Sequence, residues 1–388
     1  MKYKGAIISD LHIGAFDVEK QYEEFINIFI KKIENKNLDF IIVCGDFFDH
    51  KLYLNDKNSI YAYKMIQRLS NINTNTKIRF VYGTESHECN QYNLLPITDI
   101  KSDIRVIKNV EEEELLEDLH ILYLPEEYVY NKDRYYKNYF NKTYDYIFGH
   151  GVIREVMKEV PIKESKDTKR AKVPIFNTSE LDKICRGEVY FGHYHINREI
   201  NDIISVGSFS RWKFGEEDRK GFYFIDCDTD EKIYNREFIE NTLSDTFITI
   251  NFGYDSEIFK DSNKLEQTLD KCTSLLTNDS IDHIRFQLNV PTDAKEPEAI
   301  INYIKERYKY NDNVKINLVN GYISEKKEQN EKEIKEENDK YGFIEEDIPI
   351  EEKISTYIRI EKNKIIDPNN ILIYLTNSVE EILDKINN

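Results

Sequence analysis

The sequence contains little of what marks a secreted or membrane protein. Its 388 residues include five cysteines, an odd number with no CxxC pair. This usage argues against a disulfide framework and predicts reduced thiols in a cytoplasmic protein. No apolar run approaches the roughly 20 residues of a membrane span. The apolar run near the N-terminus, AIIS, is too short for a secretory signal, so we expect a cytoplasmic protein with no membrane contact.

Positive charge is also scarce. Lysine and arginine total 54 against 72 aspartates and glutamates, which gives a formal net charge of −18. This balance argues against a protein that coats nucleic acid by bulk electrostatics. It does not exclude an enzyme whose site is made locally positive by metal ions. With 40% hydrophobic and 13% aromatic residues, the chain has enough apolar material for a sizeable core in two or three domains.

The first 240 residues alternate between short apolar segments and amphipathic helices. Helices are predicted from about Val18 to Ile33 and around Ile60 to Leu69. The predicted strands are AIISD, DFIIVCGD, KIRFVYG, DIRVI, HILYLP, YDYIFGH and VYFGHYH, with DIISVGS and KGFYFIDCD as a closing pair. Alternation of this kind, with continuously apolar strands, predicts a layered α/β core.

The alternation of predicted strands and helices resumes at about Thr246. The segments FITINFGY, KLEQTLDKCTSLL, HIRFQLNV, EPEAIINYIKERY and VKINLVNGYI read as strand, helix, strand, helix and strand. They predict a small, self-contained α/β unit. Residues 331–347 hold eight acidic and three basic residues, which favours an exposed helix or linker. The remaining segment predicts two amphipathic helices separated by DPNN, whose apolar faces are typical of partner-binding surfaces.

Potential metal ligands follow nearly every core strand. In layered α/β folds, ligands bind at the carboxyl ends of the strands. His120 and His283 do not follow strand ends, and we assign them ordinary structural roles. The ligand candidates are Asp10, His12, Asp46, Asp49, His50, His87, His150, His193 and His195.

Aspartates and histidines together suit a pair of Mn²⁺, Fe or Zn ions. A carboxylate between two ions can bridge them at a separation of roughly 3.5–4 Å. Two cations held in this way lower the pKa of water and neutralise the phosphoryl oxygens, which is the chemistry of phosphate ester hydrolysis. A protonated histidine near the leaving oxygen would complete such a site as a general acid.

These residues resemble a known signature. Asp10-Leu-His12, Gly45-Asp46, Gly149-His150 and Gly192-His193-Tyr-His195 match the calcineurin-like metallophosphoesterases in order and spacing. HILYLPEE, VGSFSR and FGEEDRKGFYFID resemble, within that family, the nuclease subunits of the SbcD type. The resemblance covers residues 1 to about 240 and weakens beyond them.

The resemblance implies an α/β fold with four parts. Residues 1–243 would form a layered sandwich of two central mixed sheets flanked by helices, which is the nuclease domain. Residues 244–325 would form a small α/β capping domain that binds DNA. Residues 326–348 would be an acidic linker. Residues 349–388 would form a helical tail, a helix-loop-helix that binds an ATPase partner.

The implied function is a metal-dependent DNA exonuclease and endonuclease for repair and recombination. It would act on double-stranded and single-stranded DNA, as a homodimer with an SbcC-like coiled-coil ATPase. Its cofactors would be two divalent ions, Mn²⁺ first, with Fe or Zn as alternatives. The competing interpretations are a metallophosphatase or phosphodiesterase on small molecules or proteins, since the fold hosts both chemistries, and a subunit with a degraded site.

The resemblance also implies roles for single residues. One ion would be held by Asp10, His12, Asp46 and His195, with Asp46 bridging to a second ion held by His150 and His193. His87 would protonate the leaving group, with Glu88 beside it as a possible orienting residue. Asp49 and His50 would lie near the scissile phosphate or shape the surrounding loop.

One motif departs from the family. Its members usually place an asparagine ligand directly before the catalytic histidine, and this chain has Gly83-Thr-Glu-Ser86-His87-Glu88. Alignment on the histidine puts Ser86 at the asparagine position, with Glu85, Asn90 or water as alternative ligands. Substrate contacts are predicted at Arg154, Lys169 and Arg170 in a locally basic loop, and at Arg211. A solvated loop is the alternative for the basic segment.

Overall fold

The computed structural model describes residues 1–53, 55–94, 102–156, 171–253, 256–277, 281–289 and 297–318. The chain divides into two compact units, which we describe separately. The first comprises residues 1–158, 162–212 and 218–244, and the second comprises residues 159–161, 213–217 and 245–388. The main passage between them is at Ser244–Asp245, beside the expected boundary at 243/244. The expected linker, 326–348, and tail, 349–388, lie outside the described residues.

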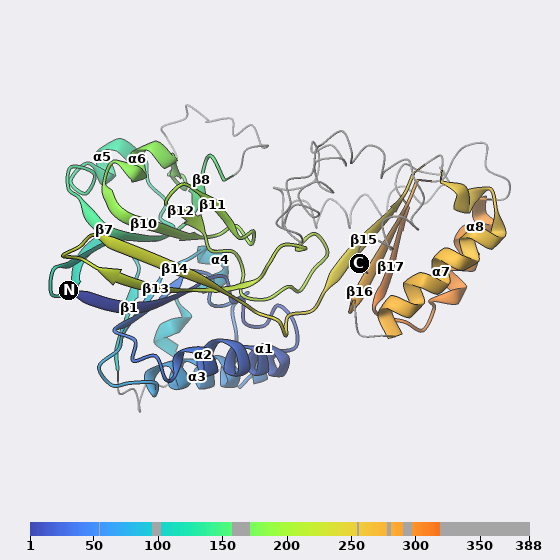
Figure 1. The fold of residues 1–388 in the computed structure, drawn as a ribbon, viewed down its shortest axis with the longest axis horizontal. Helices are drawn as coiled ribbons and strands as arrows, with labels where there is room; N and C mark the ends of the chain where they lie inside the picture. Colours follow the sequence, from blue (N-terminus) through green and yellow to red (C-terminus); the bar gives the residue numbers. More distant parts are fainter. Residues whose placement is uncertain are drawn as a thin grey trace. The chain divides into compact units, whose positions relative to one another are not determined.

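The first unit contains two six-stranded mixed sheets (Figure 1). The first sheet has the order β14-β13-β1-β2-β3-β4. Strands β1 to β4 are parallel to one another, and β13 pairs antiparallel with both of its neighbours, β1 and β14. Its strands are β1 (Lys2–Ile8), β2 (Phe40–Cys44), β3 (Lys77–Val81), β4 (Asp103–Ile107), β13 (Gly221–Asp228) and β14 (Ile233–Glu240). This arrangement makes β1 and β2 central strands, and every residue of β2 is buried, as expected for strands covered on both faces.

The second sheet has the order β11-β12-β10-β7-β6-β5. Strands β12, β10, β7 and β6 are parallel, and β11 and β5 pair antiparallel at the two edges. Its strands are β5 (Glu111–Leu116), β6 (Leu119–Leu124), β7 (Tyr144–His150), β10 (Cys185–Gly192), β11 (Arg198–Ile200) and β12 (Ile203–Ser205). Two short strands, β8 (Val152–Ile153) and β9 (Ile175–Phe176), pair separately.

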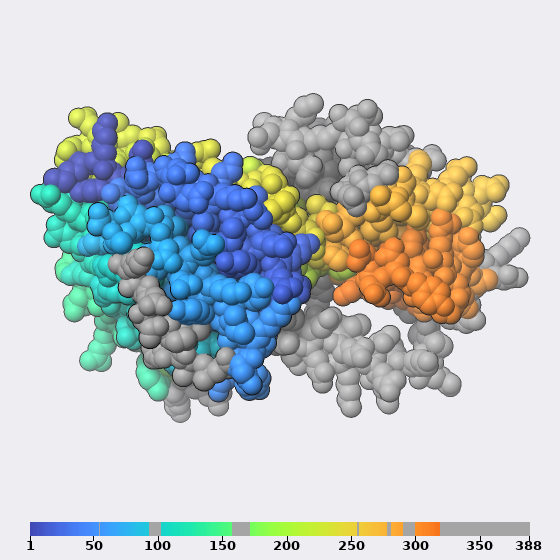
Figure 2. Space-filling view, turned by 90° about the horizontal axis from the view of Figure 1, so that it is seen from below, coloured from blue at the N-terminus to red at the C-terminus, as the bar shows by residue number. Residues whose placement is uncertain are grey.

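Three apolar layers hold this unit together. Between the sheets, side chains such as Phe40, Ile42, Tyr146, Phe148 and Tyr190 form one buried cluster. The outer face of the first sheet packs on α1 (Val18–Glu24), the π-helical η1 (Phe25–Ile30), α2 (Lys31–Ile33) and α3 (Lys57–Ser70). These helices cover the face shown in blue in Figure 2. The outer face of the second sheet packs on α5 (Lys132–Tyr136) and α6 (Thr178–Asp182).

The predicted helix from Val18 to Ile33 is continuous, although FINIFI adopts the π form in its middle. Five of the described strands were not predicted: β5, β8, β9, β11 and β14. The expected closing pair is wrong, because DIISVGS supplies β12 of the second sheet whereas KGFYFIDCD supplies β13 of the first. The partner of β13 is β14, which pairs with it over its whole length from Gly221 to Asp228.

The second unit is a three-stranded parallel sheet with two helices on one face (Figure 1). Its elements are β15 (Phe247–Phe252), η3 (Glu257–Phe259), α7 (Ser262–Thr277), β16 (His283–Leu288), α8 (Pro297–Arg307) and β17 (Val314–Leu318). Alternate residues such as Ile284, Phe286 and Leu288 pack against the helices in a single buried cluster. None of the described helices of either unit has the length and apolarity to cross a bilayer.

Candidate metal centre

The candidate centre lies where strands of both sheets end. Neighbouring parallel strands β1 and β2 lead into Asp10 and Asp46, and β3 leads into Gly83 and Thr84. In the second sheet, β7 ends at His150, β10 leads into His193, and β6 leads into Glu126. These strands run parallel within their sheets, so each sheet brings three carboxyl ends to one edge.

The two edges are joined directly. The Glu126 amide donates to the carbonyl oxygen of Tyr82 at 3.1 Å. The His193 amide lies 3.1 Å from Oδ1 of Asp10. Nδ1 of His150 lies 2.8 Å from the carbonyl oxygen of Cys44. The centre is therefore built jointly by both sheets, and its geometry depends on how they pack.

The backbone at this edge is strained. Asp10, His12 and Asp46 have φ values of 48°, 46° and 46°, and φ of His193 is 98°. Left-handed backbone at residues other than glycine costs of the order of 1–3 kcal/mol and clusters at functional sites. Gly45, with φ of 83°, allows the close approach of His150, whose ring a Cβ at that position would meet at 2.1 Å. With this backbone conformation, the side chains of these residues converge on one region.

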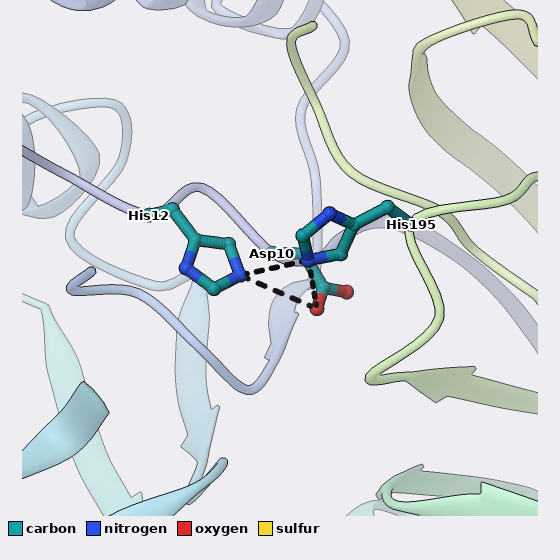
Figure 3. Close-up of side chains that lie close together, drawn as sticks. All are labelled: Asp10, His12 and His195. Atoms are coloured by element: carbon teal, nitrogen blue, oxygen red, sulfur yellow. Dashed lines mark hydrogen bonds and ion pairs between the residues drawn. The ribbon is translucent and has the colours of Figure 1, made fainter. Parts of the chain in front are cut away.

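The first group of candidate ligands is Asp10, His12 and His195 (Figure 3). Nε2 of His12 and Nε2 of His195 are 3.1 Å apart, and they lie 3.8 Å and 3.9 Å from Oδ1 of Asp10. Trp212, the chain's single tryptophan, lies beside the group, with ring centroids 5.0 Å from His12 and 4.8 Å from His195. Three ligand atoms converge here in the manner of a metal site.

The second group is Glu126, His150 and His193, with one ligand atom of each within 4.8 Å of the others. Oε2 of Glu126 lies 3.1 Å from Nδ1 of His193 and 3.9 Å from Nε2 of His150. Glu126 was not predicted from the sequence. The signal that revealed the other candidates also applies to it, because Glu126 follows the apolar strand HILYLP by one residue.

Asp46 lies between the two groups. Its Oδ2 is 3.7 Å from Nε2 of His12 and 3.2 Å from Nε2 of His150. Burial opposes the ionisation of Asp46, but the positive charge of His150 and its hydrogen bond outweigh burial and lower the pKa of this carboxyl. A buried carboxylate within reach of both groups has the position that a bridging ligand requires.

The cluster favours bound cations. Burial alone would lower the pKa of His12, but its contacts with Asp10 and Asp49 raise that pKa to about 10. The pKa of His150 is likewise raised to about 10, because Asp46 outweighs the effect of burial. Protons and metal ions compete for the same nitrogen atoms, so carboxylates that attract a proton to these rings also attract a metal ion.

The orientation of His150 fits a metal ligand. Its Nδ1 donates to the Cys44 carbonyl oxygen. A metal ion would therefore bind at Nε2, which is buried and lies 3.2 Å from Oδ2 of Asp46. A backbone carbonyl that fixes the tautomer in this way is the usual second partner of a metal-binding histidine.

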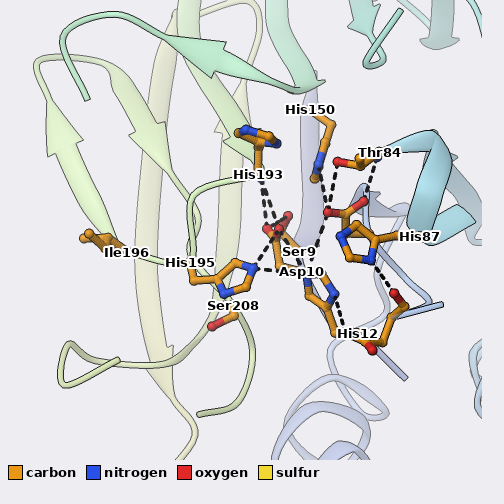
Figure 4. A network of polar contacts seen from close by, with 12 residues as sticks. Ser9, Asp10, His12, Thr84, His87, His150, His193, His195, Ile196 and Ser208 are labelled. Atoms are coloured by element: carbon orange, nitrogen blue, oxygen red, sulfur yellow. Dashed lines mark hydrogen bonds and ion pairs between the residues drawn. The ribbon is translucent and has the colours of Figure 1, made fainter. Parts of the chain in front are cut away.

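His87, Asp49 and His50 lie around the first group. Nδ1 of His87 contacts the carbonyl oxygen of Asp49, and its ring centroid is 4.8 Å from that of His12 (Figure 4). Asp49 carboxylate oxygens lie 3.4 Å from Nδ1 of His12 and 3.0 Å from Nδ1 of His50. His50 is half exposed at the rim. Glu88 does not orient His87, because it points into the core and accepts from the Phe47 amide at 3.2 Å.

The structure does not bring Ser86 to the ligand groups. Ser86 is exposed on the short helix α4 (Glu85–Glu88). The alternatives Glu85 and Asn90 bond to each other at 3.1 Å on the exposed side of this loop. Thr84 approaches the centre instead: its amide donates to Oδ1 of Asp46 at 2.7 Å, and its hydroxyl lies 3.2 Å from Oε2 of Glu126.

Two of the residues predicted to contact substrate, Arg154 and Arg211, make local hydrogen bonds in the structure. Nε of Arg154 donates to Oδ1 of Asn177 at 2.9 Å. Arg211 donates twice to the carbonyl oxygen of Asp218, at 3.1 Å and 2.8 Å. Both guanidinium groups therefore support local loop structure. Lys169 and Arg170 lie outside the described residues.

The first unit matches a known protein family over most of its length. Residues 4–217 match the family described as calcineurin-like phosphoesterase. No curated protein matches the chain. Similar solved structures include TT1561 of Thermus thermophilus, which is 10% identical with a TM-score of 0.35 and covers 62% of this chain and 100% of its own. Another is Yfce, a phosphoesterase from E. coli, which is 14% identical with a TM-score of 0.28, covering 61% and 99%.

Proposed function

This chain belongs to the calcineurin-like phosphoesterase family, and on that premise we propose that it is a metal-dependent DNA nuclease that hydrolyses phosphodiester bonds. The observation that carries the hydrolytic part is the pair of ligand groups on either side of Asp46. Two divalent ions bound there would activate water and neutralise the phosphoryl oxygens. We propose Mn²⁺ as the ion, with Fe or Zn as alternatives that the same donor set accommodates.

The chain's own residues have separate tasks in this proposal. Asp10, His12 and His195 would hold one ion, and His150 and His193 would hold the other, with Asp46 within reach of both groups. Ions bound there would hold the phosphate and orient it. The strained backbone at Asp10, His12 and Asp46 keeps these ligands in place without the substrate, so little reorganisation is needed at the moment of reaction.

His87 supplies the proton in this proposal. Its Nδ1 faces the Asp49 carbonyl oxygen, so Nδ1 carries a proton and Nε2 is the atom that exchanges protons with the substrate. Protonated at Nε2, His87 gives that proton to the leaving oxygen as the ester bond breaks. Asp49 also approaches His12, and it therefore positions the proton donor and a metal ligand together.

Two features support DNA as the substrate. The segments HILYLPEE and VGSFSR resemble nuclease subunits of the SbcD type. A separate α/β unit follows the metal centre in sequence, over β15 to β17, where that resemblance expects a DNA-binding capping domain. The competing proposal is a phosphatase or phosphodiesterase for small molecules or proteins, and the family membership is equally consistent with it.

Matched substrates separate these proposals. The purified full-length protein is incubated with Mn²⁺ and end-labelled double-stranded or single-stranded DNA, and in parallel with para-nitrophenyl phosphate and bis-para-nitrophenyl phosphate. A nuclease degrades the DNA and the diester in preference to the monoester. Preference for the monoester, with intact DNA, would support the phosphatase. A His87→Gln variant controls for contaminating nucleases.

We further propose that residues 349–388 bind an SbcC-like coiled-coil ATPase and that the complex contains two copies of this chain. The support is the amphipathic pattern of this segment and the acidic stretch before it. Full-length protein and a version ending at Asn330 are compared for co-purification with the ATPase. Loss of co-purification, with Mn²⁺ binding retained, is expected. Equal recovery of the ATPase with both versions would contradict the proposal.

A further inference from the structure

The two ligand groups differ in how completely the sequence motifs account for them. The first contains one carboxylate and two histidines, Asp10 with His12 and His195, beside the shared Asp46. The motifs supply only His150 and His193 for the second. Two histidines and a shared carboxylate would hold an ion less completely than the first group does.

The loop that was expected to supply the missing ligand is directed elsewhere. Ser86 is exposed. Glu85 and Asn90 bond to each other, and Oδ1 of Asn90 accepts from Nζ of Lys108 at 2.9 Å. Among the described residues, Glu85 belongs to none of the groups of histidines and carboxylates that could hold an ion.

Glu126 supplies a carboxylate beside the two histidines of the second group. Its side chain is 3% exposed, and its ion pairs within the described part of the chain are with His150 and His193. Its Oε2 lies 3.1 Å from one imidazole nitrogen and 3.9 Å from the other. Ligands bound to one ion at about 2.1 Å are separated by about 3.0–3.4 Å in octahedral or tetrahedral geometry. The observed separations are near this range.

A second observation points to the same ion. Nε2 of His150 is buried and lies 3.2 Å from Oδ2 of Asp46 and 3.9 Å from Oε2 of Glu126. Two buried carboxylates that converge on one imidazole nitrogen require a cation beside it, and a metal ion bound there would replace the proton that this nitrogen otherwise carries.

We propose that Glu126 is a ligand of the second metal ion through Oε2. Each ion then has one carboxylate of its own, two histidines and the shared Asp46. The hydroxyl of Thr84 donates to Oε2 at 3.2 Å and helps to hold it in place. Because the two donor sets match, the two ions should bind with similar affinity. This inference rests on the metal-binding part of the proposed function and not on the choice of DNA as substrate.

Metal counting tests the assignment without any assay of activity. Metal-free full-length protein is titrated with Mn²⁺, free Mn²⁺ is measured by electron paramagnetic resonance, and the emission of Trp212 is followed in parallel. Trp212 adjoins His12 and His195, so its emission reports the first ion. Wild-type protein is expected to bind two ions and to show the exchange-coupled signal of a neighbouring pair.

Three variants decide the result. Glu126→Gln should weaken one ion at least tenfold, and Glu126→Ala should bind one ion, with the Trp212 titration unchanged in both. Glu127→Gln is the matched control, because Glu127 accepts from the Val110 amide and the Tyr135 hydroxyl and contacts neither histidine. It should bind two ions as the wild type does. Thermal unfolding of each metal-free variant verifies its fold, and Glu126→Asp, which keeps the charge, replaces any variant that does not fold.

Other outcomes overturn the assignment. If Glu126 only holds the His193 ring in place, Gln keeps the hydrogen bond acceptor, and Glu126→Gln binds two ions with wild-type affinity. Equal weakening of both ions would also contradict a specific role at the second. A wild-type protein that binds two ions and leaves DNA intact would refute the nuclease proposal alone. A protein that binds no divalent ion would refute both.

Discussion

The backbone carbonyl of Asp49 accepts a hydrogen bond from Nδ1 of His87. The same residue directs a carboxylate oxygen to within 3.4 Å of Nδ1 of His12. One residue therefore sets the orientation of both a candidate proton donor and a candidate metal ligand. Burial opposes the ionisation of Asp49, but His12 and His50 outweigh it and lower its pKa to about 2. The Asp49 carboxylate is thus charged throughout the physiological pH range.

Replacing His87 with Gln should separate catalysis from metal binding. The variant should bind two Mn²⁺ ions, because His87 is the proton donor and not a ligand in our account. Its turnover should fall by about 10²–10⁴-fold, which is the usual loss on removing a general acid. Stopped-time cleavage of labelled DNA measures the rate, and Mn²⁺ counting measures the ions. Wild-type turnover would exclude His87 as the proton donor.

Replacing Asp46 with Asn should affect both ions. The amide oxygen can still accept from the Thr84 amide, so the loop is preserved while the shared negative charge is lost. We expect both ions to bind at least about tenfold more weakly, at the lower end of the range for changes in metal-site partners. Isothermal titration with Mn²⁺ measures the affinities. If only one ion is weakened, Asp46 is not shared.

Replacing Thr84 with Val removes a hydroxyl and leaves the shape and the amide hydrogen bond to Asp46 intact. Because that hydroxyl lies 3.2 Å from Oε2 of Glu126, the second ion should bind up to about tenfold more weakly. Thr84→Ser keeps the hydroxyl and should behave as the wild type does. Equal Mn²⁺ affinities for the Val and Ser variants would show that the hydroxyl has no part in metal binding.

Glu88 should make the stability of the metal-free protein depend on pH. Burial, reinforced by the charge of Asp46, raises its pKa from 4.5 to about 8. Between these values the folded protein binds a proton that the unfolded chain has lost. Its contribution to stability is therefore present below about pH 4.5 and is lost as pH rises to about 8, with a slope of at most about 1.4 kcal/mol per pH unit.

Glu88→Gln should remove this contribution. Urea unfolding in a chelator between pH 5 and 9 gives the free energy of unfolding of both proteins. The wild type should lose more stability over this interval than the variant. The histidines that also titrate in this range contribute equally to both proteins, so their contribution cancels when the two free energies of unfolding are subtracted. Parallel curves would show that Glu88 is ionised in the folded protein. Saturating Mn²⁺ should reduce the difference, because bound cations near Asp46 favour the ionised carboxylate.

The positions of the candidate ligands at strand ends could be predicted from the sequence because the rule that places them is local. A continuously apolar strand such as FIIVC must be buried, and the polar residue after it, Asp46, must emerge at the sheet edge. The rule does not say which ends from two different sheets meet. The distance from Asp46 to His150 depends on sheet-to-sheet packing, which no periodicity encodes.

The missed elements have physical explanations. Strand β5 reads EEEELL, a composition with low strand propensity. Its glutamates pair with residues that the local sequence does not reveal: Glu113 pairs with Arg79, and Glu112 with Lys142. Glu126 obeys the strand-end rule but belongs to none of the histidine-containing motifs, so the motif pattern did not predict it. Ser86 was assigned by counting back from His87, whereas Thr84 follows Gly83 directly and keeps its place beside Asp46.

Anomalous X-ray scattering from a crystal of the full-length protein grown with Mn²⁺ tests the central claim most directly. Our account predicts two peaks roughly 3.5–4 Å apart, one bounded by Asp10, His12 and His195, the other by Glu126, His150 and His193, with Asp46 between them. A single peak, or peaks on other residues, would contradict a centre built from both groups.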